Sequence, residues 1–156
     1  MLKWVEITSP RLRTIHQQWM VSRGARLLPG IADYNHFAEL QKSANAPSCS
    51  VLICIPPGGA RATIKHRGDA VRDVVRPDVL DGMALAVSPA VGCDVVVLPF
   101  RQVCTTRQPD CRRGESGNRQ ADSRYEILLL PFDDGRLRVC LIHATFDITE
   151  ARAREA

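Results

Sequence analysis

Six cysteines and four histidines are the residues of this chain that could bind a metal or serve as nucleophile and base. They are Cys49, Cys54, Cys93, Cys104, Cys111, Cys140, His16, His36, His66 and His143. No two cysteines are spaced as Cys-x-x-Cys, and none lies with a histidine at zinc-finger spacing. Cys54 and Cys140 lie in apolar runs, where a free thiol behaves as a small buried hydrophobe. We therefore predict reduced structural thiols and no metal site.

Catalytic motifs are also missing from the sequence. The chain has no Gly-x-Ser-x-Gly elbow, no phosphate-binding glycine loop and no His-Glu-x-x-His. The carboxylate pair Asp133-Asp134 lies in a predicted turn, and the pair Glu150 and Glu155 lies in a charged tail. Catalysis needs an acid, base or nucleophile held next to a partner. We therefore predict a non-enzymatic protein, and a small enzyme with a convergent His/Cys/acid site remains a rival.

Bulk properties indicate one soluble globular domain. The 156 residues are 45% apolar and 24% charged, and no apolar run approaches the roughly 18–20 residues that span a bilayer. The first residues carry no signal-peptide pattern, so we expect a cytoplasmic location. Arginine supplies most of the net charge of +4 but is scattered along the chain. A nucleic-acid-binding regulator needs a clustered basic face, which scattered arginines do not indicate. We therefore keep this function only as an alternative.

An amphipathic helix is predicted near the start of the chain. Ser9 can cap it, Pro10 suits its first turn, and Gly24 suits its end. Its apolar stripe consists of Leu12, Ile15 and Trp19, at steps of three and four. This stripe is our candidate dimer or partner face, although the same pattern also fits a helix that covers its own core.

The remaining pattern predicts short strands around a helical middle. Strands are expected at 50–55, 60–66, 111–115, 123–132 and 137–146, and helical segments at 34–41, 69–75 and part of 78–105, including 100–105. Asp134-Gly135 between the last two apolar runs is typical of a tight hairpin turn, because glycine tolerates positive φ. Two strands, a helical middle and three further strands predict an α+β fold.

Several motifs resemble those of PAS sensor domains, and in particular a compact family of bacterial single-domain PAS proteins. The matching elements are Trp19, Arg23-Gly24, Pro29, Thr106–Pro109, Leu128–Gly135 and Asp147-Ile148-Thr149. The resemblance implies a five-stranded antiparallel sheet with helices on one face. It divides the single domain into an N-terminal helical segment (1–48), a PAS-like core (49–149) and a short charged C-terminal helix (150–156).

The resemblance also implies where a ligand and a signal would act. The candidate lining of a PAS cleft is Leu85, Val97, Phe100, Leu129 and Ile142. No cofactor can be assigned, since the photochemical flavin motif is absent and no histidine occurs between His66 and His143. Asp147 and Thr149 would couple the sheet to the exit helix, or would merely cap that helix.

The function expected from these features is a cytoplasmic, PAS-like sensor or adaptor that relays a signal by binding a protein partner. A homodimer is expected, with no membrane contact. The main alternative is a sensor that binds a small metabolite or cofactor in the cleft. The nucleic-acid-binding regulator is the second alternative.

Overall fold

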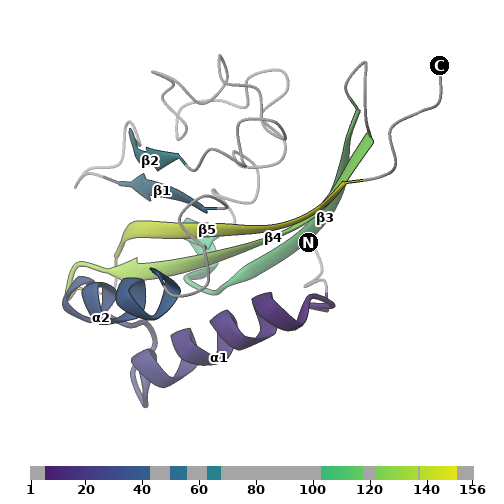
Figure 1. Ribbon diagram of the computed structural model, residues 1–156. Coiled ribbons are helices and arrows are strands. Elements are labelled where there is room, and N and C mark those ends of the chain that lie inside the picture. Colours follow the sequence, from purple (N-terminus) through teal and green to yellow (C-terminus); the bar gives the residue numbers. More distant parts are fainter. Residues whose placement is uncertain are drawn as a thin grey trace, which may run out of the picture.

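The structure is a computed structural model that describes residues 6–42, 50–55, 63–67, 103–117, 122–136 and 138–150. Two helices come first in the chain and pack on one side of a sheet (Figure 1). The elements are α1 (Pro10–Arg23), α2 (Ile31–Lys42), β1 (Ser50–Cys54), β2 (Thr63–Arg67), β3 (Asp110–Gly117), β4 (Asp122–Asp133) and β5 (Val139–Glu150). Residues 103–106 are also helical. The predicted α+β class is confirmed.

The ends of α1 lie where the sequence predicts them. Ser9 is the N-cap, and its hydroxyl accepts the N–H of Leu12 at 3.2 Å. Pro10 occupies the first turn, where its missing N–H costs nothing. Gly24 ends the helix at φ +59°, and its N–H donates to the carbonyl of Met20 at 3.1 Å. Glycine adopts this left-handed conformation without the strain that a Cβ would add.

Every strand pairing is antiparallel, in the order β2-β1-β5-β4-β3. The last strand in the chain therefore lies in the middle of the sheet. The predicted strands are present with shifted bounds, and the largest shift is at the end of β5. That strand continues beyond the apolar run 137–146, through Asp147-Ile148-Thr149, and ends at Glu150. Residues 147–150 stay extended because they pair with residues 123–126 of β4.

The turn between β4 and β5 uses Asp134-Gly135, as predicted. Gly135 has φ +90°, and its N–H donates to Oδ1 of Asp133 at 3.1 Å. Asp134 also binds Arg138 across the turn. Its N–H donates to the carbonyl of Arg138, and its carboxylate accepts a hydrogen bond from the Arg138 guanidinium at 3.0 Å. Such local side-chain bonds, together with the positive φ that glycine tolerates, explain why Asp-Gly pairs favour turns.

Both faces of the long strands β4 and β5 are buried. Side chains alternate along each strand, and we call the side that carries α1 and α2 the helix face. The helix face of β4 and β5 consists of Glu126, Leu128, Leu130, Phe132, Leu141, His143, Thr145 and Asp147. The opposite face includes Ile127, Leu129, Ile142, Ala144 and Phe146. Residues 125–133 and 141–146 are all buried, which explains why these strands are continuous apolar runs rather than alternating ones.

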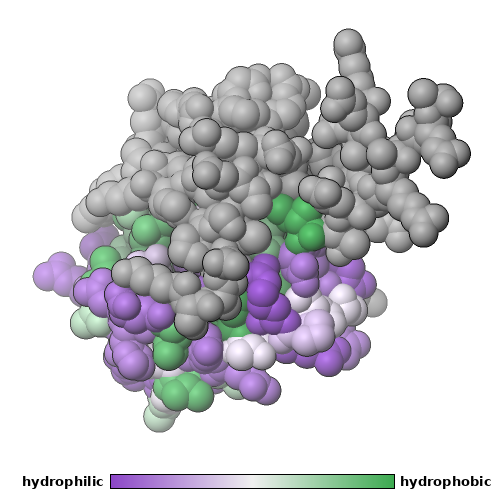
Figure 2. All heavy atoms as spheres, in the orientation of Figure 1, coloured by the Kyte–Doolittle hydropathy of each residue, from purple (hydrophilic) through white to green (hydrophobic). Residues whose placement is uncertain are grey.

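The core of the helix face contains three of the largest fully buried side chains, those of Trp19, Phe37 and Phe132. Trp19 is 1% exposed, and Phe37 and Phe132 are fully buried with ring centroids 5.3 Å apart. His143 on β5 stacks edge-on against Phe37 at 5.2 Å. The outer surface of α1 and α2 is mainly hydrophilic with apolar patches (Figure 2). The helices therefore act as a cover over this face of the sheet.

Some predicted elements lie outside the described residues. These are the helical turn at 69–75, most of the segment 78–105, and the C-terminal helix beyond Glu150. Of the predicted helix at 100–105, the described part is helical.

Candidate functional site

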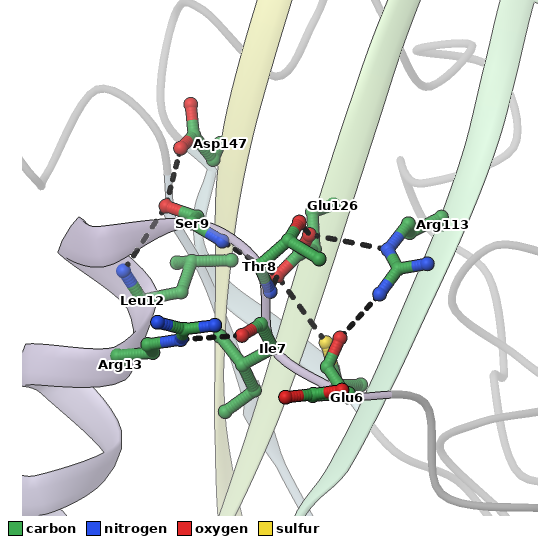
Figure 3. A network of polar contacts seen from close by, with 10 residues as sticks. Glu6, Ile7, Thr8, Ser9, Leu12, Arg13, Arg113, Glu126 and Asp147 are labelled. Atoms are coloured by element: carbon green, nitrogen blue, oxygen red, sulfur yellow. Dashed lines mark hydrogen bonds and ion pairs between the residues drawn. The ribbon is translucent and has the colours of Figure 1, made fainter.

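The start of α1 is fastened to the helix face of the sheet by polar side chains from three strands (Figure 3). We call residues 6–9, which lead into α1, the N-terminal strap. We call Thr8, Ser9, Arg113, Glu126 and Asp147 the strap cluster. Ile7 is the apolar anchor of the strap, with 6% of its surface exposed. The cluster joins the beginning of the chain to β3, β4 and β5.

Glu126 is the centre of the strap cluster. Its side chain on β4 is buried, and its Oε1 accepts the backbone N–H groups of Thr8 at 2.9 Å and Ser9 at 3.2 Å. Its Oε2 accepts the hydroxyl of Thr8. In a capping box, a Glu or Gln three residues into the helix accepts the N–H of the cap residue. Leu12 occupies that position in α1 and cannot accept, so the carboxylate of Glu126 takes this role from the sheet.

The strand β3 adds two further donors to Glu126. The Nε of Arg113 donates to Oε2 at 3.3 Å, and the same guanidinium donates to the carbonyl of Glu6. The buried thiol of Cys111 lies 3.7 Å from Oε1. Arg113 is about half exposed, and water screens such a pair, so its ion pair contributes at most about 1 kcal/mol. The backbone N–H groups of the strap are therefore the main partners of Glu126.

Asp147 holds the cap of α1 from the neighbouring strand. The hydroxyl of Ser9 donates to Oδ2 of Asp147 while it accepts the N–H of Leu12. Asp147 lies directly opposite Glu126 in the antiparallel register, so the two carboxylates are neighbours on the helix face. The guanidinium of Arg11 donates to the carbonyl of Phe146. The first turn of α1 thus contacts the last part of β5 through both side chain and backbone.

The hydrogen bonds determine the charge of Glu126. Burial alone would raise its pKa, but the bonds from Thr8, Ser9 and Arg113 outweigh burial and hold the pKa of Glu126 below its ordinary value. Burial raises the pKa of Cys111 to about 12, and the nearby carboxylate adds to this effect. At neutral pH the pair is therefore a carboxylate and an uncharged thiol.

This arrangement is suited to holding the chain and poorly suited to catalysis. Both carboxylate oxygens of Glu126 already accept hydrogen bonds, whereas a general base needs a free oxygen within reach of a substrate proton. Burial also raises the pKa of Cys104 and Cys140, each to about 11, so neither thiol forms the reactive thiolate at neutral pH. Within the described residues, no three His, Cys, Asp or Glu side chains are grouped as metal ligands.

The structure tests part of the predicted cleft lining. Leu129 and Ile142 are fully buried on neighbouring strands, and both belong to the face opposite α1 and α2. Leu85, Val97 and Phe100 lie outside the described residues. The structure therefore brings two of the five candidates to one face, where they serve as core side chains.

The predicted dimer or partner face is wrong for this fold. Leu12, Ile15 and Trp19 are 0%, 3% and 1% exposed, because they pack against the chain's own core. Their stripe covers the sheet, which is the other use that the pattern allowed. The exposed apolar side chains around these helices are different ones, namely Met20, Val21, Leu27, Ile31 and Leu40.

The structure describes part of the signal junction and all of His143, which lies on β5. Asp147 and Thr149 both lie within β5, and the structure describes the side chain of Asp147 but not that of Thr149. His143 is 4% exposed and packs against the rings of Tyr34 and Phe37, as expected for a histidine that is part of the core.

Sequence reasoning missed Glu126 and the strap. One signal was present, because Glu126 is the charged residue in the otherwise apolar run 125–132 of β4. A buried carboxylate in a strand requires partners, since burial without them is costly. Nothing in the sequence, however, identified Thr8 and Ser9 as those partners.

Comparison of the chain with protein-family models finds no match, and comparison with curated proteins likewise finds none. Among the helices of the described ranges, none has the length and apolarity needed to cross a membrane.

Proposed function

We propose that this chain is a non-enzymatic, PAS-like sensor or adaptor domain that relays a signal by binding another protein. The observation that carries the proposal is the contact between Asp147 and Ser9. Asp147 belongs to the Asp-Ile-Thr segment that resembles the signalling end of PAS domains. Through Ser9 this carboxylate reaches the cap of α1, so a change in the central strand has a direct path to a helix on the surface.

Two further features support the proposal. Among the described residues, two strands come before residues 68–102 and three come after them, and the PAS resemblance implies such a succession. The strap cluster uses its acceptors to hold the chain, and the raised thiol pKa values of Cys104, Cys111 and Cys140 are those of unreactive side chains. Both fit a relay function better than the rival of a small enzyme.

Affinity capture with a matched control tests this function. The full chain would be immobilised as wild type, as Asp147→Asn and as Asp134→Asn, which alters a carboxylate in the exposed turn far from Ser9. We expect a partner protein that the wild type and Asp134→Asn retain and that Asp147→Asn retains less well. Equal retention by all three proteins, or retention by none, would contradict a relay through Asp147.

Native mass spectrometry of the purified chain separates the adaptor from its main alternative. A bound small molecule would favour the metabolite sensor, in which Leu129 and Ile142 would contribute to the cleft. A ligand-free chain would favour the adaptor. The mass in the same spectrum shows whether the chain forms the expected homodimer. The contact between the two copies would not involve Leu12, Ile15 and Trp19, because these side chains are buried.

A further inference from the structure

We propose that the N-terminal strap and the first turn of α1 form a releasable unit that separates from the sheet while the end of α1 stays in place. This inference rests on the proposed function, for which it names the moving element. It follows from how the two ends of the helix are attached, and it can be tested without any partner.

The strap and the first turn are connected to each other as well as to the sheet. The Nε of Arg13 donates to the carbonyl of Ile7 at 2.6 Å, and the N–H of Arg13 donates to the carbonyl of Ser9 at 3.0 Å. These bonds lie within the segment, so they persist if the segment leaves the sheet. Residues 6–13 can therefore move together.

The attachment of this unit to the sheet combines polar bonds with two buried apolar side chains, Ile7 and Leu12. Glu126, Asp147, Arg113 and Arg11 supply it through hydrogen bonds to the strap, to Ser9 and to β5. Water can replace each of these partners when the unit separates, so the net free energy per bond is small. Separation would also expose Ile7 and Leu12, whose aliphatic side chains are smaller than the indole ring buried at the other end of the helix.

The other end of α1 is attached differently. Trp19 is buried, and its indole N–H donates to the carbonyl of Pro131 at 2.8 Å. Gln18 accepts a hydrogen bond from Gln41 of α2 at 2.6 Å, and Leu28 buries its side chain soon after the helix ends. Separation here would expose a large ring and leave a buried carbonyl without its donor, so this end acts as the fixed point.

A sensor that uses this unit would change the contacts of Glu126 or Asp147 and leave the core intact. Both carboxylates lie at the end of the β4–β5 pair, next to the residues that extend the strand to Glu150. A shift of β5 in this region moves Asp147 relative to Ser9. The output would then be the free or bound state of the first turn of α1.

Hydrogen exchange measured peptide by peptide tests the proposal on the full chain. Wild type would be compared with Glu126→Gln, Asp147→Asn and the control Asp134→Asn. We expect exchange in the first turns of α1 to accelerate about ten-fold in the first two variants, as loss of a charge-assisted hydrogen bond predicts. Exchange in the last turn of α1 and in β4 and β5 should stay within about two-fold of wild type.

Uniform acceleration over α1 and the sheet in Glu126→Gln would overturn the proposal, because it would show one cooperative unit. Unchanged exchange in α1 would overturn it as well. If Glu126→Gln does not fold, Ser9→Ala removes the bond to Asp147 without altering a buried charge, and the same two outcomes apply. Local release in the exchange experiment, combined with equal partner capture by wild type, Asp147→Asn and Asp134→Asn or with capture by none of them, would contradict only the proposed function.

Discussion

The two ends of α1 are held to the same sheet by different interactions. At the start, Glu126 and Asp147 bind the strap and the cap through hydrogen bonds. Near the end, Trp19 is buried and donates to Pro131. A hydrogen bond contributes about 0.5–1.5 kcal/mol net, whereas removal of a buried aromatic ring costs about 3–5 kcal/mol. Ile7 and Leu12 are buried at the start as well, but the largest single contact is that of Trp19. The Trp19 end therefore fixes the helix in place, and the hydrogen-bonded, polar end is where a modest change can alter it.

Removal of the Trp19 side chain should have the largest effect. We expect Trp19→Ala to lower the free energy of unfolding by about 3–5 kcal/mol, because it leaves a cavity and an unpaired carbonyl. Urea unfolding followed by circular dichroism measures this change. Val21→Ala is the matched control on the same helix, since Val21 is 82% exposed, and it should stay within about 0.5 kcal/mol of wild type. If Trp19→Ala lowered the free energy of unfolding less than Glu126→Gln does, the start of α1 and not its end would be the more firmly held.

The polar end should respond most strongly to Glu126. We expect Glu126→Gln to lower the free energy of unfolding at pH 7 by about 1–3 kcal/mol, since the amide presents a donor where the strap also presents donors. Urea unfolding again provides the measurement. Asp134→Asn serves as control because Asp134 lies in an exposed turn. Equal stability of Glu126→Gln and wild type would show that the strap cluster does not hold α1.

Lowering the pH should weaken the bonds between Glu126 and the residues that lead into α1. The pKa of Glu126 is lower in the folded chain than its ordinary value, so its contribution to stability is complete above the ordinary pKa. That contribution is lost as the pH falls through the folded pKa. The difference in unfolding free energy between wild type and Glu126→Gln should therefore shrink as the pH falls through this range. A difference that stays constant over this pH range would show that the charge of Glu126 does not cause the stabilisation.

The exposed member of the strap cluster should matter least. We expect Arg113→Ala to change the free energy of unfolding by less than about 1 kcal/mol, because its side chain is about half exposed and its ion pair is screened. Raising the salt concentration should reduce even this difference. A loss as large as that of Glu126→Gln would indicate that the guanidinium, and not the strap backbone, is the main partner of the carboxylate.

Local signals explain how much of the fold was predictable. Ser9, Pro10 and Gly24 define the ends of α1 through bonds within a few residues, and Asp134-Gly135 defines the hairpin in the same way. The apolar period of α1 identified its buried side but not what covers it. Leu12, Ile15 and Trp19 were therefore assigned to a partner face when they pack on the chain's own sheet.

Contacts that are distant in sequence explain the errors. Ser9 and Glu126 are 117 residues apart, and no local rule connects a cap residue with a carboxylate in a later strand. The PAS resemblance led us to expect Asp147-Ile148-Thr149 where the last strand runs into the exit helix, and it did not identify what this segment pairs with. Pairing with residues 123–126 of β4 keeps this segment extended through Glu150. Of the candidate site, only Asp147 was identified from sequence, and its partner Ser9 was predicted only as a cap.

A double-mutant cycle between Ser9 and Asp147 tests the central claim most directly. The free energy of unfolding would be measured for wild type, Ser9→Ala, Asp147→Asn and the double variant. Because the two side chains are hydrogen-bonded, we predict an interaction energy of about 0.5–3 kcal/mol. Additive effects, within about 0.3–0.5 kcal/mol, would contradict a connection between the last strand and the cap of the first helix.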